Sequence, residues 1–327
     1  MKKNIALVTG GYSGESVISY KSAEFISKHI DADKWTSFLV DIHPSGWFHP
    51  TATGENIAID KNDFSLTLAG QKIIFDAVLV SLHGTPGEDG KLQGYFDCLK
   101  IPYTSCDAAT SALTFNKRYT VAVAAFAGLQ VAKSIHLFKD DIITAVDICS
   151  QLKLPLFVKP NNGGSSIGMS KVSDAADVEA AVAKAFYEDD QVLVEEFIKG
   201  REFTIGVFKH QGTVVALPIT EIISKNEFFD FQAKYEGASE EITPAEVSDS
   251  IAEKVRLAAR KAYSVFNCKG IVRIDFIYDE ESGYPYMLEI NTVPGQSSAS
   301  LVPQQVVAAG WTLKDFYSAL IEECLHR

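Results

Sequence analysis

The stretch that most constrains the fold is GIVRIDFIYDEESGYPYMLEINTVPG, residues 270–295, in which two alternating runs flank the turn-like segment DEESG. Alternation of apolar and polar residues on both sides of a short turn predicts an antiparallel hairpin. Successive side chains of a strand point to opposite faces, so one face would be apolar, with Val272, Ile274, Phe276, Leu288 and Ile290. The other face would carry Arg273, Asp275, Glu289 and Asn291. Carboxylate and amide oxygens are ligands that suit Mg²⁺, so the hairpin predicts a metal-binding face, with a solvated polar face as the alternative.

Composition narrows the class of protein. The chain has 327 residues, 46% hydrophobic and 22% charged, which is enough material for two or three domains with ordinary cores. Its formal net charge of −12 argues against a nucleic-acid or anionic-membrane partner. The five cysteines are scattered without a CxxC pair, the apolar run near the N-terminus is too short for a signal peptide, and no run approaches a membrane span. We therefore expect a cytoplasmic protein with reduced thiols.

The first third has the pattern of an α/β domain, which we place at residues 1–113. Strand-like runs alternate with polar or helical stretches, which predicts a mainly parallel sheet; the runs are at 5–9, 37–42 and 75–82. The loops TGGYSGES and LHGTPGEDGKLQG follow the first and third runs, where the carboxyl ends of parallel strands form a ligand crevice. Glu15 in the first loop is either a ligand contact or a helix-start residue. His83 in the second is either functional or structural, and Glu88 and Asp89 could orient it.

The rest of the chain divides into two further units, at 114–196 and 197–327. In the first of these we expect helices at 117–127 and 174–187 and strands at 154–158 and 191–197. In the second we expect strands at 202–208 and 213–219 before the hairpin and a helix at 251–266 opened by a capping box of Ser250 and Glu253. We also expect a closing helix that starts at Thr312, with Asp315 in the matching position of a capping box. Residues 224–245 lack a clear period and are predicted to form a lid loop.

The segment VKPNNGGSSIGMSK resembles a phosphate-binding loop without its lysine. Gly163 and Gly168 have the spacing of a Walker A loop, but methionine stands where that loop needs lysine. We interpret the segment as a phosphate loop of another kind, in which backbone N–H groups and the hydroxyls of Ser165 and Ser166 surround phosphate oxygens. Lys159, at the end of the preceding strand, would supply positive charge. The alternative is a Gly/Ser surface hairpin.

Taken together, the motifs resemble those of the D-alanine–D-alanine ligases, a family of the ATP-grasp superfamily. The matching segments run in family order from the first strand to the last helix: GGYSGES, LHGTPGEDGKLQG, VKPNNGGSSIGMSK, REFTIGV, AKY, RIDF and LEINTVPG…SLVP. Any one of them alone is weak, whereas seven in order are specific. The resemblance implies a three-domain fold of α/β and α+β class, in which an N-terminal parallel-sheet α/β domain precedes two subdomains that hold ATP between the central and C-terminal sheets.

For the nucleotide, the resemblance implies that Lys117 and Lys159 contact ATP phosphates and that Lys234 reaches the γ-phosphate when the lid closes. The residues implied at the adenine and ribose are Glu195, Glu196, Ile198 and Glu202. The residues implied to carry two Mg²⁺ ions, for which Mn²⁺ could substitute, are Asp275, Glu289 and Asn291.

For the first D-alanine, the resemblance implies that Glu15 holds the ammonium group. Ser165 and Tyr235 would be linked to Glu15, and His83 would lie near this substrate. A tyrosine at position 235 goes with D-alanine as the second substrate in this family, and a phenylalanine with D-lactate.

The implied reaction is phosphoryl transfer followed by acyl transfer. One D-alanine carboxylate attacks the γ-phosphate of ATP, and the amine of the second D-alanine then attacks the acylphosphate. Arg273 and the backbone N–H of Gly295 would form the oxyanion site, and Ser300 and Leu301 would receive the second carboxylate. The dipeptide would serve peptidoglycan precursor synthesis, and a homodimer is the habit of the family.

Two alternatives stay open, and several residues depart from the family pattern. The same reaction with D-serine or D-lactate as the second substrate is one alternative, and a catalytically silent nucleotide-binding regulator is the other. A silent regulator would be expected to lack at least one residue of the metal and arginine set, all of which are present. The departures from the family pattern put the lid contacts and the loop geometry in question. This chain has Gly163 where the family has glutamate, Phe229 and Phe231 where it has tyrosine, Gln232 where it has glutamate, Gln296 where it has methionine and Ala299 where it has histidine.

Overall fold

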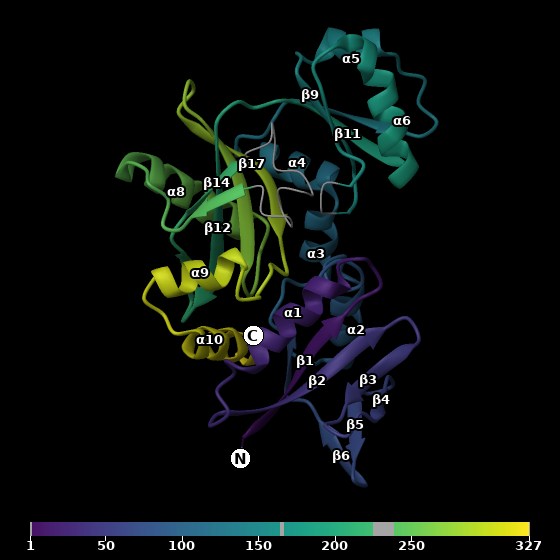
Figure 1. Ribbon diagram of the computed structural model, residues 1–327, viewed down its shortest axis with the longest axis vertical. Coiled ribbons are helices and arrows are strands. Elements are labelled where there is room, and N and C mark those ends of the chain that lie inside the picture. The colour runs from purple at the N-terminus through teal and green to yellow at the C-terminus, as the bar shows by residue number, and fades with distance from the viewer. Residues whose placement is uncertain (1, 164–166, 225–238, 327) are drawn as a thin grey trace.

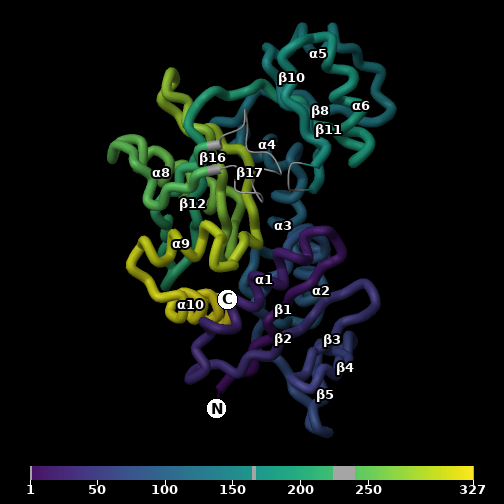
Figure 2. Tube along the Cα trace, viewed as in Figure 1, coloured from purple at the N-terminus to yellow at the C-terminus, as the bar shows by residue number. Residues whose placement is uncertain are grey.

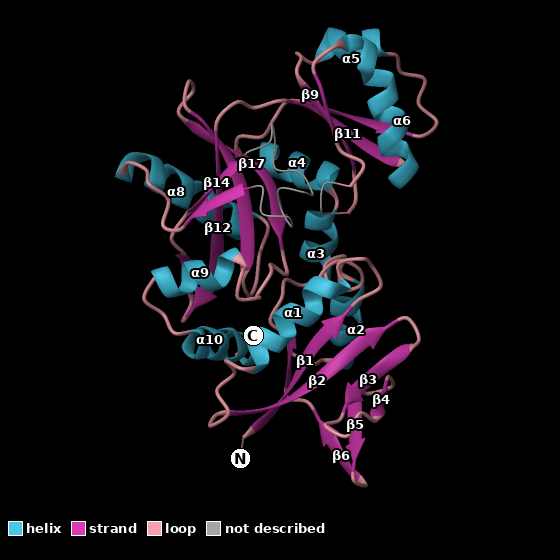
Figure 3. Ribbon diagram, in the orientation of Figure 1, coloured by secondary structure: helices cyan, strands magenta, loops and turns pink. Residues whose placement is uncertain are grey.

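The computed structural model of the protein describes residues 2–163, 167–224 and 239–326. These residues build three sheets, which lie apart from one another along the molecule (Figures 1 and 3). Helices α3 (Ala108–Phe115) and α4 (Lys117–Phe126) run between the first sheet and the second. No helix within the described ranges is long and apolar enough to cross a bilayer.

The first sheet has the strand order β6-β5-β4-β3-β2-β1-β7. Its centre is parallel, as predicted, because β1 (Lys3–Gly10) lies between β2 (Trp35–His43) and β7 (Ala77–Val80). Ile5 and Leu7 of β1 pack in one core with α1 (Ser16–Ser27) and α10 (Leu313–Leu325), while Ala6 and Val8 pack in another with α2 (Lys91–Leu99). The middle of β1, residues 5–8, is continuously apolar because both of its faces are covered. The closing helix α10 thus returns to the first sheet, where the C-terminus lies (Figure 2).

The prediction of a mainly parallel sheet holds only for this centre. Four short strands extend the sheet from β2 by antiparallel pairing: β3 (Gly46–Pro50), β4 (Asn56–Asp60), β5 (Ser65–Leu68) and β6 (Gln71–Ile74). They follow one another through tight connections, which parallel strands cannot use. The parallel strands therefore provide the edge that carries the two glycine-rich loops.

The second sheet has the order β10-β9-β11-β8. Its strands are β8 (Ser134–Phe138), β9 (Leu156–Pro160), β10 (Ser170–Val172) and β11 (Gln191–Glu196). Helices α5 (Ala145–Gln151) and α6 (Val178–Glu188) share its core, with Val178 fully buried and Val182 and Phe186 packed against it. The helix predicted at 174–187 therefore corresponds to α6 and the short 3₁₀ turn η1 (Ala175–Asp177) before it.

The third sheet contains the predicted hairpin. Its order is β15-β14-β12-β16-β17, with β13 paired to β12. The strands are β12 (Arg201–His210), β13 (Thr213–Ala216), β14 (Thr220–Ser224), β15 (Ser239–Ile242), β16 (Val272–Asp279) and β17 (Tyr284–Asn291). The register pairs Arg273 with Asn291 and Asp275 with Glu289, so the polar face exists as predicted. A register shift next to Asp275 changes the apolar face, because Met287 is buried there and Leu288 is only half-buried.

Two helix and loop predictions in this unit need correction. Helix α8 (Asp249–Val265) is capped by Ser248, whose hydroxyl accepts from the Ile251 N–H, and not by the predicted box of Ser250 and Glu253. Ser250 therefore lies inside the first turn. Within the predicted lid loop, residue 224 belongs to β14 and residues 239–242 form β15, and residues 225–238 lie outside the described part of the chain. The cap of α10 by Thr312 is confirmed, since its hydroxyl accepts from the Asp315 N–H at 3.0 Å.

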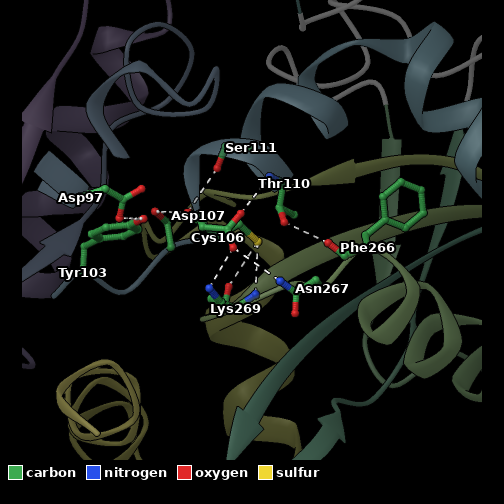
Figure 4. A network of polar contacts seen from close by, with 10 residues as sticks. Asp97, Tyr103, Cys106, Asp107, Thr110, Ser111, Phe266, Asn267 and Lys269 are labelled. Carbon is green, nitrogen blue, oxygen red and sulfur yellow. Dashed lines mark hydrogen bonds and ion pairs between the residues drawn. The ribbon is translucent and has the colours of Figure 1, made fainter. Parts of the chain in front are cut away.

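A polar network joins the end of the first unit to the strand that carries the arginine (Figure 4). The Cys106 thiol accepts from the Lys269 N–H at 3.3 Å, and Lys269 Nζ lies 2.8 Å from Asp107. Thr110 Oγ1 donates to the Phe266 carbonyl at 3.0 Å. Gly270, at φ +62°, lies so close to the Thr104 carbonyl that a Cβ there would be 1.6 Å from its oxygen. The start of β16 is therefore held directly against the first unit.

Candidate active site

A cavity of about 640 Å³ gathers most of the predicted site residues, from loops of the first unit and from the third sheet. The predicted residues that line it are Glu15, His83, Lys117, Glu202, Arg273, Asp275, Glu289, Asn291, Gly295, Ser300 and Leu301. The predicted residues that do not line it are Lys159, Glu195, Glu196 and Ile198. The remaining candidates, Ser165, Ser166, Lys234 and Tyr235, lie outside the described residues.

Asp275 is the centre of the polar face. Arg273 donates to its carboxylate through Nε at 2.9 Å and Nη2 at 2.8 Å, which is a two-pronged contact of the kind arginine favours. Thr204 Oγ1 donates to the same carboxylate at 2.5 Å, and Asn291 Nδ2 lies 3.2 Å from it. Thr204 was not among the predicted site residues, although the alternation of REFTIGV places it opposite the buried Phe203 and Ile205. Asp275 is therefore held in one orientation by three neighbours.

Arg273 is fixed by negative charge. Burial alone would lower the pKa of the Arg273 guanidinium, but Asp275, Glu289 and Glu88 outweigh that effect and raise it. The arginine thus stays charged at any physiological pH, and its side chain is 22% exposed toward the cavity. A permanent cation in a partly desolvated site can stabilise a developing oxyanion.

The same face has the chemistry of a magnesium site. Asp275, Glu289 and Asn291 contribute two carboxylates and one amide from neighbouring strand positions. No group of three or more histidine, cysteine, aspartate or glutamate side chains suited to a metal is found among the described residues. Mg²⁺ commonly takes one or two carboxylates and completes its shell with water and substrate phosphates. The donor set therefore fits a metal bound together with a nucleotide.

Glu15 lies at the end of the first glycine-rich loop, where it is the N-cap residue of α1. Gly84 faces it from the second loop, at φ +66°, and a Cβ there would lie 2.6 Å from Glu15 Oε2 and 2.5 Å from Ser13 Oγ. Only glycine fits between these groups. The two glycine-rich loops are thus in contact, as expected from their positions at the ends of neighbouring parallel strands.

His83 is buried and its partners differ from the predicted ones. Ser22 Oγ lies 3.2 Å from His83 Nε2, and Ser19 Oγ accepts from the His83 N–H at 2.9 Å. Burial, and then the positive charge of Arg273, lower the pKa of His83 to about 4, so the ring is neutral at pH 7. Asp89, which we expected to orient the ring, instead accepts from Thr85 Oγ1 at 2.6 Å.

Glu88 also has a different role from the predicted one. Its Oε2 accepts from the Gly84 N–H at 2.7 Å, and its Oε1 accepts from the Val293 N–H at 3.3 Å. Burial, and then the charge of Glu15, raise the pKa of Glu88 to about 8. Glu88 therefore joins the second glycine-rich loop to the loop that follows β17, and it lines the cavity.

The loop from 292 to 300 leads into helix α9 (Leu301–Ala308). Ser300 occupies the N-cap position, and its hydroxyl accepts from the Ser297 N–H at 3.0 Å. Leu301 begins the helix, so its N–H belongs to the first turn, where anions are favoured. A Cβ at Gly295 would lie 2.8 Å from Ser300 Oγ, which keeps position 295 small. Gln296, present in place of methionine, is buried and accepts from the Tyr317 hydroxyl at 3.2 Å.

The residues predicted to contact the nucleotide are divided between the cavity and the second sheet. Lys117 Nζ lies 2.7 Å from the Gly163 carbonyl, and both residues line the cavity. Lys159 of β9 is paired with Leu193 of β11, and Glu195 lies two residues further along β11, so the two side chains are diagonal neighbours. They form an ion pair with an Nζ–Oε1 distance of 2.5 Å. Gly163 has φ +95°, a conformation that side-chain-bearing residues rarely adopt, so the glutamate expected there would be strained.

Comparisons with known proteins identify the family to which this sequence is similar. The family model described as D-ala D-ala ligase C-terminus matches residues 116–322, and the one described as D-ala D-ala ligase N-terminus matches residues 4–106. A protein named D-alanine--D-alanine ligase from Parabacteroides distasonis is 46% identical over 323 residues, covering 99% of this chain and 98% of that relative.

Solved structures of similar proteins cover the whole fold. The VanG D-Ala:D-Ser ligase from Enterococcus faecalis has a TM-score of 0.89 at 30% identity, covering 98% of this chain and 99% of that one. The D-alanine--D-alanine ligase from Bacillus anthracis complexed with ATP has a TM-score of 0.80 at 27% identity, covering 99% and 98%.

Proposed function

This chain belongs to the D-alanine–D-alanine ligase family, and from that premise we propose how its residues join two D-alanines with the use of ATP. The dipeptide D-alanyl-D-alanine is a building block of peptidoglycan. The observation that supports the assignment of roles is that one cavity contains three features. They are the half-buried Arg273, the possible magnesium ligands Asp275, Glu289 and Asn291, and Glu15 at the start of α1.

The first chemical step is phosphoryl transfer. A carboxylate oxygen of the first D-alanine attacks the γ-phosphorus of ATP, the bond to the β,γ-bridging oxygen breaks, and ADP leaves. Two Mg²⁺ ions held by Asp275, Glu289 and Asn291, replaceable by Mn²⁺, would neutralise the phosphate charge. Lys117 lines the cavity where the phosphates would lie, and we assign Lys159 and Lys234 to the same phosphates and Ser165 and Ser166 to the loop over them. Positioning and charge neutralisation are the main requirements of such a step, which needs no protein nucleophile.

The second step is acyl transfer. The amine of the second D-alanine attacks the carbonyl carbon of the acylphosphate, and phosphate leaves as the tetrahedral intermediate collapses. Arg273 and the Gly295 N–H would donate to the oxyanion, a contribution of about 3–4 kcal/mol per donor in comparable sites. Ser300 and the start of helix α9 at Leu301 would hold the second carboxylate, since helix N-termini favour anions.

The remaining assignments concern the substrate pockets. Glu15 would hold the ammonium group of the first D-alanine, with Ser165 and Tyr235 linked to it and His83 nearby. Adenine and ribose would be held by Glu195, Glu196, Ile198 and Glu202. In this account the Lys159–Glu195 ion pair places a phosphate-binding and an adenine-binding residue side by side on the second sheet.

D-Serine is the second candidate for the second substrate. The observation that favours it is the close structural likeness to a protein named as a D-Ala:D-Ser ligase. Tyr235 argues against D-lactate, because its hydroxyl would complete a hydrogen-bond set with Glu15 and Ser165. We also propose a cytoplasmic location, supported by five free cysteines, and a homodimeric assembly in keeping with the family.

The test is a panel of second substrates with product identification. Purified protein is incubated with ATP, Mg²⁺ and D-alanine, alone or with D-serine or D-lactate, and ADP release and product mass are measured. We expect ADP release that depends on D-alanine and Mg²⁺, is lost with a chelator, and accompanies the mass of D-alanyl-D-alanine. ADP release without a dipeptide would overturn the ligase assignment, and a preference for D-serine would favour the second candidate.

A further inference from the structure

Two carboxylates of the cavity flank one glycine. The Gly84 N–H donates to Glu88 Oε2 at 2.7 Å, and the Cβ position of the same residue lies 2.6 Å from Glu15 Oε2. Since the N and Cβ positions of one residue are only about 2.5 Å apart, these two oxygens of Glu15 and Glu88 lie no more than about 8 Å from each other. Both side chains line the cavity. Two acids placed this closely favour a cation between them.

Backbone groups hold the Glu88 carboxyl group beside the cavity. Each of its oxygens accepts one backbone N–H, from Gly84 and from Val293. The charged and titratable groups that act on it are Glu15 and Arg273, and His83 on the same loop is neutral. Arg273 is already engaged by Asp275 through both prongs of its guanidinium. A cationic group of a substrate at this end of the cavity would therefore meet two carboxylates, those of Glu15 and Glu88.

The titration of Glu88 agrees with this reasoning. Burial and the charge of Glu15 raise its pKa to about 8, so Glu88 carries a proton at pH 7 as long as no cation is present. An ammonium group beside it would favour the carboxylate and release that proton. Binding of a cationic substrate should then strengthen as the pH rises toward and above 8.

We propose that Glu88 acts together with Glu15 as a second carboxylate for the ammonium group of the first D-alanine. The inference rests on the proposed function, which assigns only Glu15 to that group. It gives the site a means of choosing an amino acid over a simple carboxylic acid, because only a substrate with an ammonium group would gain from both carboxylates. Through Val293 the same side chain also positions the loop that leads to Gly295.

The test compares substrates with and without an ammonium group. Hydroxylamine traps the acylphosphate as a hydroxamate, so the first step can be followed with D-alanine and ATP before any second D-alanine reacts. Propionate has the methyl and carboxylate groups of D-alanine but no ammonium group, and its Ki against D-alanine is measured in the same assay. In Glu88→Gln we expect the KM for D-alanine to rise about tenfold, with the Ki of propionate changed by less than about twofold. An equal loss of affinity for both compounds would overturn the proposal, because it would mean that Glu88 only holds the loop.

Two controls keep the result interpretable. Asp89→Asn removes the same charge one residue further along, where the carboxylate bonds Thr85 and Lys91 and does not line the cavity, and it should leave both constants unchanged. Glu88→Asp keeps the charge on a shorter side chain and should retain part of the preference for D-alanine.

In the native protein D-alanine affinity should increase between pH 7 and 9, and this increase should be absent in Glu88→Gln; a pH response that persists in the variant would contradict the proposal. A native protein that forms neither hydroxamate nor dipeptide would refute the proposed function itself, which is a separate outcome.

Discussion

Replacing Thr204 with valine removes one hydroxyl from beneath Asp275 and changes little else. Thr204 is 2% exposed, and its Oγ1 donates to Asp275 Oδ1 across the β12–β16 pair. Valine has nearly the same shape, so no cavity is created. The carboxylate keeps its two contacts from Arg273 but loses the group that fixes it from the neighbouring strand.

The magnitude follows from the kind of bond that is lost. A hydrogen bond to a charged group contributes about 1.5–3 kcal/mol. If Asp275 must hold its orientation for Arg273 and for the metal in the transition state, the same amount appears in the barrier. Because about 1.4 kcal/mol corresponds to a tenfold change in rate, kcat/KM for dipeptide formation should fall about tenfold to a hundredfold.

The assay measures kcat/KM by ADP release and stability by urea unfolding, for Thr204→Val and for a matched control. Thr220→Val is the control, because Thr220 is fully buried on the adjacent strand β14 and its hydroxyl bonds Thr243 and Gln305, away from the cavity. Both variants should lose a similar unfolding free energy, and only Thr204→Val should lose activity. Equal activity in the two variants would refute the reasoning, since it would show that the hydroxyl contributes to folding alone.

Two further predictions concern the amino-acid end of the site. Tyr235→Phe should shift the second substrate toward D-lactate, measured as the ratio of ester to dipeptide formed in competition, and an unchanged ratio would remove the role given to that hydroxyl. The unfolding free energy should fall as the pH drops from 6.5 to 4, by up to about 3 kcal/mol from His83, because the unfolded histidine binds a proton at its ordinary pKa near 6.5 and the folded one only near 4. His83→Asn should remove this slope in urea titrations at pH 7 and 5, and a slope as steep as in the native protein would place the effect elsewhere.

The parts of the fold that could be predicted are those with a strong hydrophobic periodicity or with a capping residue at the start of a helix. The hairpin of β16 and β17 and its polar face could be predicted because Arg273 and Asp275 alternate with large apolar residues. The cap of α10 was predicted because Thr312 stands three residues before Asp315. The cap of α8 was missed because three consecutive candidates, at 248, 249 and 250, are all good capping residues, and local sequence does not choose among them.

Other features depend on tertiary contacts that the sequence alone does not display. Leu288 leaves the apolar face because the register shifts there: Asp275 pairs with Glu289 and Phe276 with Met287, so Leu288 is passed over in the pairing. The strands β3 to β6 are four or five residues long and partly exposed, so their alternation is weak. They were missed for that reason.

In the candidate site, too, sequence motifs identify some residues, whereas other residues depend on tertiary contacts. Residues in recognisable motifs could be named, and the cavity gathers most of them. Thr204 and Glu88 acquire their roles only through partners far away in sequence, Asp275 and Val293. The ion pair of Lys159 with Glu195 likewise depends on the pairing of β9 with β11.

The acylphosphate route is tested most directly by following a carboxylate oxygen of the first D-alanine. D-Alanine with ¹⁸O in its carboxylate is supplied with ATP and Mg²⁺, and the released phosphate is analysed by mass spectrometry. If a carboxylate oxygen attacks the γ-phosphorus and later leaves with it, each dipeptide formed is accompanied by one phosphate that contains one ¹⁸O atom. Unlabelled phosphate released together with dipeptide would contradict the acylphosphate route, and with it the roles proposed for Arg273 and Gly295.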